Sequence, residues 1–290
     1  MPSRTWVFTY SLFTLLSATT LLEPRVLAGA EDVLGQAAAK TDQHPEAQEA
    51  LRRGIVDFKN GQTKQAEQDF LRAKQLAPEL LDARLYLATA YASEYIPGAP
   101  GEANVSNANA AAAEFRGVLV LDPQNLRAMD ALGSLLFQMA GQPFNRDLFF
   151  EAKSCFTRHT ESKAEDAQPY YWIGVIDWTL AFRANGELRA QFNHRAGAQR
   201  VSDSDPLPRD LREQYSREYG QTIEEGIESL KRAISIKPDY ADAMAYLNLL
   251  LRRKADVVTR EDEREELLQM ADDLVDKIKE IYAERAQKQP

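Results

Sequence analysis

The chain has 290 residues, of which 44% are hydrophobic, enough to bury a sizeable core. The formal net charge of −9 and the pI near 5.1 argue against a nucleic-acid partner, because phosphate binding needs a basic surface. The single cysteine, Cys155, excludes an internal disulfide.

The first 30 residues have the composition of a secretion signal. Arg4 gives a basic start, residues 6–22 are mostly apolar, and Ala28 and Ala30 offer small-residue cleavage points. The apolar run is diluted by serines and threonines, so its length is marginal for spanning a bilayer. We expect cleavage after Ala28 or Ala30 and a periplasmic or secreted protein without stable membrane insertion. An uncleaved segment that anchors the chain in an inner membrane is the alternative.

Residues 31–46 have a helical lead-in pattern that breaks at His44 and Pro45. The next stretch, residues 47–78, has the pattern of two helical segments joined by a turn. The first segment carries a small residue, and the second carries small residues and a large one. These positions are Gly54, then the turn Asn60-Gly61, then Ala66, Phe70, Ala73 and Pro78. The pattern resembles a tetratricopeptide repeat (TPR), a helix–turn–helix unit of 34 residues.

This resemblance implies an all-α, right-handed αα-superhelix of about five helix pairs over residues 47–286, with inserted segments. The expected repeats span approximately 47–80, 81–125, 126–166, 167–240 and 241–286. Ala88, Gly133 and Gly174 stand where the first repeat has Gly54, and Ala88 follows Gly54 by 34 residues. We expect all four at close contacts between adjoining helices.

Two segments interrupt the repeats. Residues 96–109 begin with prolines and glycines, which predict a projecting loop. Residues 183–221 are an insertion in the fourth repeat: the first helix continues, breaks at 203–208 and resumes as a charged helix over 209–219.

The last helix carries an apolar stripe at heptad spacing, which could close the solenoid or form a homodimer. The stripe consists of Leu267, Ala271, Leu274, Ile278 and Ile281.

No motif indicates a metal, a cofactor or a catalytic nucleophile. The three histidines lack metal-ligand spacing, and no serine lies in a nucleophile elbow. His159 and Cys155 fall on a core-facing helix, where we expect both to be buried structural residues. Asp177 interrupts an apolar run, and we expect it to pair with an arginine such as Arg183 or Arg189, or to face the groove. A buried general acid is the alternative.

The resemblance implies a non-catalytic scaffold that holds a protein or peptide in a groove lined by the first helices of successive repeats. The groove candidates are Leu51, Ile55, Phe58, Asp130, Phe137, Tyr171, Val175 and Trp178. These side chains could instead pack against the inserted segments. The alternative function is a small-ligand or enzyme site at the insertion, with Asp177, Arg183, Arg189 and Arg195 as secondary candidates. Arg183, Arg189, Arg195 and Arg200 also form a locally basic run that could take an acidic partner.

Overall fold

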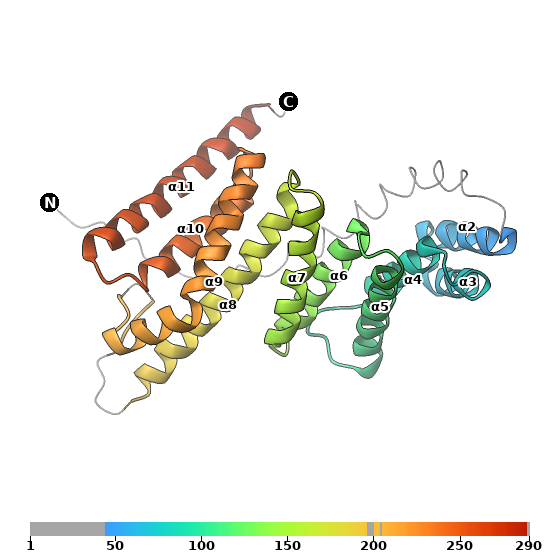
Figure 1. Ribbon diagram of the computed structural model, residues 1–290, viewed down its shortest axis with the longest axis horizontal. Coiled ribbons are helices and arrows are strands. Elements are labelled where there is room, and N and C mark those ends of the chain that lie inside the picture. Colours follow the sequence, from blue (N-terminus) through green and yellow to red (C-terminus); the bar gives the residue numbers. More distant parts are fainter. Residues whose placement is uncertain (1–43, 196–199, 204, 289–290) are drawn as a thin grey trace. The chain divides into compact units, whose positions relative to one another are not determined.

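The computed structural model (Figure 1) describes residues 44–195, 200–203 and 205–288. The expected signal and most of the lead-in lie outside these residues. The described residues form ten helices and no strand, which confirms the all-α prediction. The chain divides into two compact units, 1–94 and 95–290, so the boundary falls inside the expected second repeat.

The first unit contains a TPR-like helix pair and one further helix. Helix α2 (Pro45–Lys59) pairs with α3 (Thr63–Leu76), and α4 (Leu81–Ser93) packs on both. The core lies where the three helices meet. Phe70 is fully buried there and stacks on Tyr86, with 5.4 Å between the ring centroids.

The described residues of the second unit form seven helices that pack against their neighbours in chain order (Figure 1). The sequence motifs define three pairs among them, α6–α7, α8–α9 and α10–α11, which correspond to the third, fourth and fifth repeats. The helices are α5 (Glu102–Leu121), α6 (Leu126–Gly141), α7 (Arg146–Ser162), α8 (Ala167–Asn193), α9 (Arg209–Ile236), α10 (Ala241–Ala255) and α11 (Glu261–Lys288).

Three of the four small residues lie at the close contacts that the repeat pattern requires. A Cβ atom added to Gly133 would lie 2.8 Å from the ring of Phe156, and one added to Gly174 would lie 2.3 Å from Leu230. Gly54 faces Phe70 in the same way, and Ala88 is fully buried. The pairs α2–α3, α6–α7 and α8–α9 therefore close by placing a large residue of the second helix over a small residue of the first.

The fifth repeat closes differently, because Asn248 occupies the place of the glycine. Its side-chain amide donates a hydrogen bond to the backbone carbonyl of Ala271 in α11, at 2.9 Å, and its oxygen accepts one from Arg252. Asn248 is 6% exposed, so a buried polar side chain joins α10 to α11 with both ends of its amide bonded.

The insertion of the fourth repeat lengthens both helices of the pair. Helix α8 has 27 residues and α9 has 28, and the charged stretch expected at 209–219 continues without a break into the second helix of the repeat. The extension has its own core. Tyr215 is fully buried against α8 and donates a hydrogen bond to the carbonyl of Ala181, and Leu211 is buried beside it.

The loop expected over residues 96–109 is shorter than predicted, because α5 begins at Glu102. Asn104, in the first turn of α5, fixes the loop. Its side chain accepts a hydrogen bond from the backbone of Ile96 and donates to the carbonyls of Ile96 and Ala99. The prolines and glycines therefore occupy only the segment before Glu102, and the alanine-rich residues that follow are helical.

We expect Gly174→Ala to lower the free energy of unfolding by about 1–3 kcal/mol, because the added methyl group overpacks the contact with Leu230. Gly186→Ala is the matched control on the same helix. Nothing lies within 4 Å of its added Cβ atom, so the protein should gain about 0.5–1 kcal/mol from the better helix former. Urea unfolding of both variants measures the difference, and equal effects would contradict the close contact at Gly174.

Candidate partner-binding surface

Five aromatic rings gather on α8 and on the start of α10. We call them the aromatic surface, and they are Tyr171, Trp178 and Phe182 of α8, Tyr240 before α10 and Tyr246 of α10. The three residues of α8 share one face because they are spaced by seven and four positions. The two tyrosines come to the same place because α10 packs on α8.

The rings support one another. Trp178 stacks on Phe182 with 5.1 Å between centroids and meets the edge of Tyr246 at 5.2 Å. Tyr171 contacts Tyr240 and Tyr246 at 5.2 and 5.7 Å. Burial raises the pKa of the Tyr171 hydroxyl well above its ordinary value, so this ring belongs to the base of the group. Trp178 and Phe182 are thus held in place by packed neighbours.

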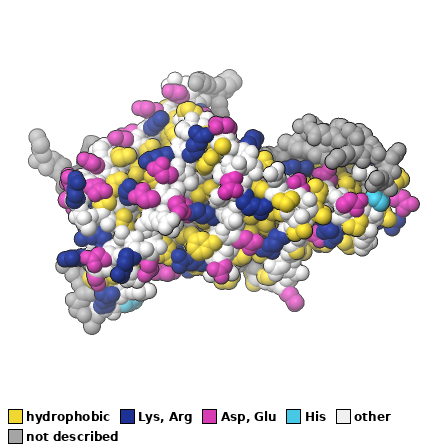
Figure 2. Space-filling view, viewed as in Figure 1, with side chains coloured by type: hydrophobic (Ala, Val, Ile, Leu, Met, Phe, Trp, Pro, Cys, Tyr) yellow, Lys and Arg dark blue, Asp and Glu magenta, His cyan; other side chains and the backbone are white. Residues whose placement is uncertain are grey.

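Part of the aromatic surface remains open to solvent. Phe182 is 42% exposed, and Trp178 is half-buried. The face of the second unit seen in Figure 2 carries interspersed acidic and basic side chains, with hydrophobic side chains between them. Beside Phe182, Arg183 stacks on Phe144 at 4.1 Å and donates a hydrogen bond to Glu187. Exposed aromatic area beside charged groups is the composition of many protein interfaces.

Other groove candidates of the second unit are packed inside it. Val175 is 2% exposed, and Phe137 is 9% exposed, in edge contact with Phe149 and Trp172. Asp130 is partly exposed, and one carboxylate oxygen lies 2.6 Å from Nδ1 of His159. Val175 and Phe137 therefore leave little side-chain surface for a partner, whereas Asp130 keeps 45% of its side chain exposed.

His159 and Cys155, which we expected to be buried structural residues, are both buried. His159 is 3% exposed and is held by Asp130, while Cys155 is 4% exposed. Burial raises the pKa of the Cys155 thiol to about 11, which keeps it in the unreactive protonated form near neutral pH.

The first unit holds three further candidates. Leu51 and Ile55 are buried in the contact of α2 with its neighbours, at 4% and 7% exposure. Phe58 is half-buried and meets Phe70 edge-on, with 6.5 Å between centroids. Among these three, Phe58 retains the most surface for a contact with another molecule.

Asp177 pairs with a lysine, so the expectation of an arginine partner is wrong. Lys153 of α7 reaches across α8, and its ammonium group lies 2.7 Å from Asp177 Oδ1 and 2.7 Å from Glu225 Oε2 of α9. We call these three residues the Lys153 bridge. Asp177 has no exposed surface, and burial raises its pKa to about 7 against the opposing effect of Lys153. The acid therefore has no open path to an external substrate in this structure.

The arginines of the insertion do not form one basic ridge. Arg189 is 3% exposed, with hydrogen bonds to Asn185 Oδ1 at 2.7 Å and Asp256 Oδ1 at 3.1 Å, and to the carbonyl of Ser202. Arg195 is exposed and pairs with Asp210. Arg183 is exposed and lies apart from the Lys153 bridge, with Glu187 as its ion-pair partner. Arg189 is therefore a buried structural residue and is not exposed on the surface to bind an acidic partner.

Sequence reasoning omitted three members of the aromatic surface from the candidate site. Phe182 follows Trp178 by four residues, so helical spacing alone could have included it. Tyr240 and Tyr246 belong to the next repeat, and only the packing of α10 on α8 brings them to Trp178. That packing joins two repeats, so no local pattern within one helix reports it.

Within the part of the chain that the structure describes, no three His, Cys, Asp or Glu side chains are grouped as metal ligands. The described helices also include none with the length and apolar character needed to cross a membrane.

Comparison with known proteins shows the fold. No protein-family model matches the chain, and no curated protein matches it. A crystal structure of the MamA protein aligns with a TM-score of 0.54 and 16% identity, over 84% of this chain and 96% of that one. A structure of MamA from Desulfovibrio magneticus RS-1, covering residue 41 to the end, aligns with a TM-score of 0.54 and 16% identity, over 85% of this chain and 99% of that one. MamA has a TPR fold, and the present chain shares this TPR-like arrangement of paired helices.

Proposed function

We propose that the protein is a non-catalytic scaffold that binds a protein or peptide partner on the aromatic surface of α8 and α10. The observation that carries this proposal is the stacked pair of Trp178 and Phe182, which stays partly exposed although Tyr246 packs against Trp178. Large aromatic side chains that are already ordered lose little conformational entropy when a partner covers them.

The surroundings of the aromatic surface support a protein partner. Arg183, the residue after Phe182 in the chain, is exposed, and its guanidinium group is held by Phe144 and Glu187. Asp242 in the first turn of α10 supplies an exposed carboxylate near Tyr246. A partner that offers apolar side chains and polar groups of both signs would match this mixture.

The N-terminal pattern supports a second part of the proposal, that the scaffold acts outside the cytoplasm. The 30 leading residues have a basic start, an apolar stretch and small residues at the end. N-terminal sequencing of the protein from separated cell fractions tests this. A periplasmic chain that starts at Gly29 or Glu31 is the expected result, and an intact Met1 in the membrane fraction would indicate the anchored alternative.

A photo-reactive amino acid at position 182 tests the binding surface. We expect the Phe182 variant to form a discrete covalent adduct with a partner in living cells, because the side chain lies at the centre of the proposed contact. Val120 of α5 is the control position, since it is 79% exposed and outside the aromatic surface. Mass spectrometry of the adduct identifies the partner.

The adduct at position 182 should disappear when Trp178 is replaced by alanine, while helicity measured by circular dichroism stays unchanged. Equal labelling from positions 182 and 120, or an adduct that persists without Trp178, would count against the aromatic surface.

A further inference from the structure

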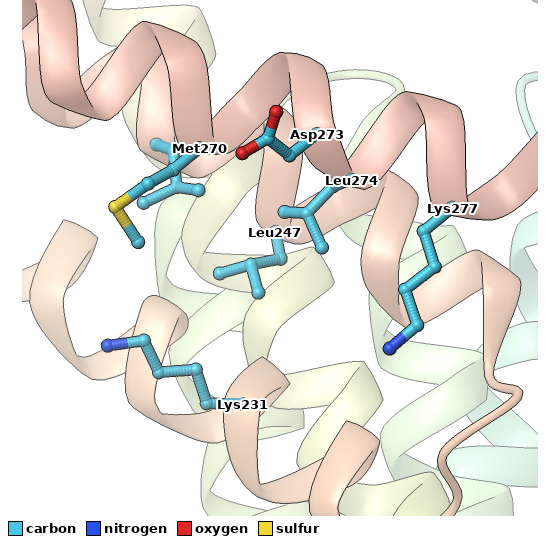
Figure 3. Close-up of a pocket in the computed structure, with 7 residues that line it drawn as sticks. Lys231, Leu247, Met270, Asp273, Leu274 and Lys277 are labelled. Atoms are coloured by element: carbon cyan, nitrogen blue, oxygen red, sulfur yellow. The ribbon is translucent and has the colours of Figure 1, made fainter.

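A slot between α9 and α11 opens on the second unit (Figure 3). Its volume is about 250 Å³, and its floor and one wall are apolar: Leu247 and Leu251 of α10, and Met270 and Leu274 of α11. Cavities of about 150 Å³ already hold a benzene molecule, so this volume admits at least one large apolar side chain. Met270 is 47% exposed, which leaves its thioether free to pack on an incoming group.

The preceding groove of the same unit shows how the protein closes such a space by itself. Between α7 and α9, Lys153 crosses over α8 and binds both Asp177 below and Glu225 on the opposite helix. The Lys153 bridge thus fills the groove with an internal ion-pair network.

In the fifth repeat the corresponding positions are apolar. The register follows from the small residues: Asn248 stands where α8 has Gly174, and fully buried Ala271 stands where α9 has Gly226. Counted from these positions, the residues that replace Asp177, Glu225 and Lys153 are Leu251, Met270 and Ile227. None of these three residues is charged, so the Lys153 bridge has no counterpart at these positions between α9 and α11.

Two lysines flank this apolar slot. Figure 3 shows Lys231 of α9 and Lys277 of α11 on either side of Leu247. Lys231 has an exposed ion pair with Glu228 of its own helix, at 3.2 Å, and no ion pair of Lys277 occurs within the described residues. Asp273 also borders the slot and keeps its negative charge, since its hydrogen-bond partner Gln269 is neutral. The charged residues that line the slot are therefore two lysines and one aspartate, which leaves a net positive charge.

We propose that this slot docks a short acidic amphipathic helix of a partner protein. A leucine-sized side chain of that helix packs on Leu251 and Met270, and carboxylates on either side of it meet Lys231 and Lys277. The apolar contact supplies affinity through burial, and the two ammonium groups select acidic over basic segments. This site uses none of the five rings of the aromatic surface, so each of the two proposals can fail alone.

The test uses the purified protein and a fluorescent synthetic helix with a leucine face and glutamates on both sides of it. Two matched probes carry lysines in place of the glutamates, or alanines in place of the leucines. Fluorescence anisotropy at low salt should rank the leucine–glutamate probe first, and added salt should weaken its binding because it screens the exposed charges.

The charge-reversed variant Lys231→Glu/Lys277→Glu should bind the leucine–glutamate probe about tenfold more weakly and the leucine–lysine probe more tightly than the unchanged protein does. The control is Arg217→Glu/Lys279→Glu, which reverses one exposed cation on each of the same two helices outside the slot. It should leave both affinities within about twofold of the original, because distant exposed charges are screened.

Three results would overturn the proposal: equal binding of the glutamate and lysine probes, equal binding of the leucine and alanine probes, or equal effects of the two double variants. If Trp178→Ala abolishes probe binding while the slot variant leaves it intact, the probe occupies the aromatic surface and the slot proposal fails.

Discussion

Replacing Lys153 by methionine should lower the free energy of unfolding by about 3–5 kcal/mol at pH 8, because it leaves the fully buried carboxylate of Asp177 without its partner. Lys153 is itself largely buried, with 19% of its side chain exposed, so water screens this pair little. Among the described residues the second oxygen of Asp177 has no hydrogen-bond partner, which leaves Lys153 as the group that compensates the charge.

The loss should shrink as the pH falls. Burial raises the pKa of Asp177 to about 7 in the folded protein, and removal of Lys153 removes the effect that lowers it. In the folded variant Asp177 therefore keeps its proton up to a higher pH than in the unfolded chain, where the pKa of Asp177 has its ordinary, lower value. The stability of the variant is therefore greatest below the unfolded pKa and falls as the pH rises through the folded pKa. Urea unfolding at pH 5 and pH 8 measures the difference.

Two further variants isolate the cause. The double variant Lys153→Met/Asp177→Asn should recover part of the stability at pH 8, since no buried charge remains. Lys231→Met should change stability by no more than about 0.5 kcal/mol, because Lys231 forms only an exposed pair within its helix. If Lys153→Met has the same small effect as Lys231→Met at pH 8, Asp177 does not depend on the bridge.

Replacing Asp256 by asparagine should cost about 3 kcal/mol, the second largest effect that we expect. Asp256 follows α10 and is 5% exposed, and it lies 3.1 Å from Arg189 and 3.2 Å from Arg253. Asn185 donates to it as well. Because this network also holds the carbonyl of Ser202, its loss should loosen the insertion at the ends of α8 and α9.

Asp210→Asn is the matched control, since it removes an equally spaced ion pair of the same insertion. Asp210 and Arg195 lie 3.2 Å apart, but both side chains are more than half exposed, so the change should cost less than about 1 kcal/mol. Thermal unfolding and the rate of trypsin cleavage after Arg200 report the two effects. Similar curves for both variants would contradict a buried network at Asp256.

The fold could be predicted from sequence because the paired helices depend on local spacing. Gly54 with Phe70 and Gly133 with Phe156 are each a small residue of a first helix and a large residue of the second, and the structure brings them into contact. The pattern was weakest where another chemistry replaced the small residue. Asn248 joins its helix pair through a hydrogen bond, which apolar periodicity does not report.

The candidate site could be predicted only in part, because its geometry depends on long-range contacts. Asp177 was recognised as unusual, yet its partner Lys153 lies 24 residues earlier, on a different helix. Arg189 had the sequence environment of an exposed arginine, and its burial depends on Asp256, 67 residues later. Charge and spacing within one segment therefore identify which residues are exceptional, while the packing of distant helices decides whether they are exposed.

The most direct test of the aromatic surface is the fluorescence of Trp178 in the variant Trp6→Phe/Trp172→Phe, in which it is the sole remaining tryptophan of three. We predict that titration with the partner identified by cross-linking shifts the Trp178 emission to shorter wavelength and removes its quenching by iodide, because the partner covers a half-buried indole. Saturable binding without any change in emission or quenching would contradict the claim that the partner rests on α8 and α10.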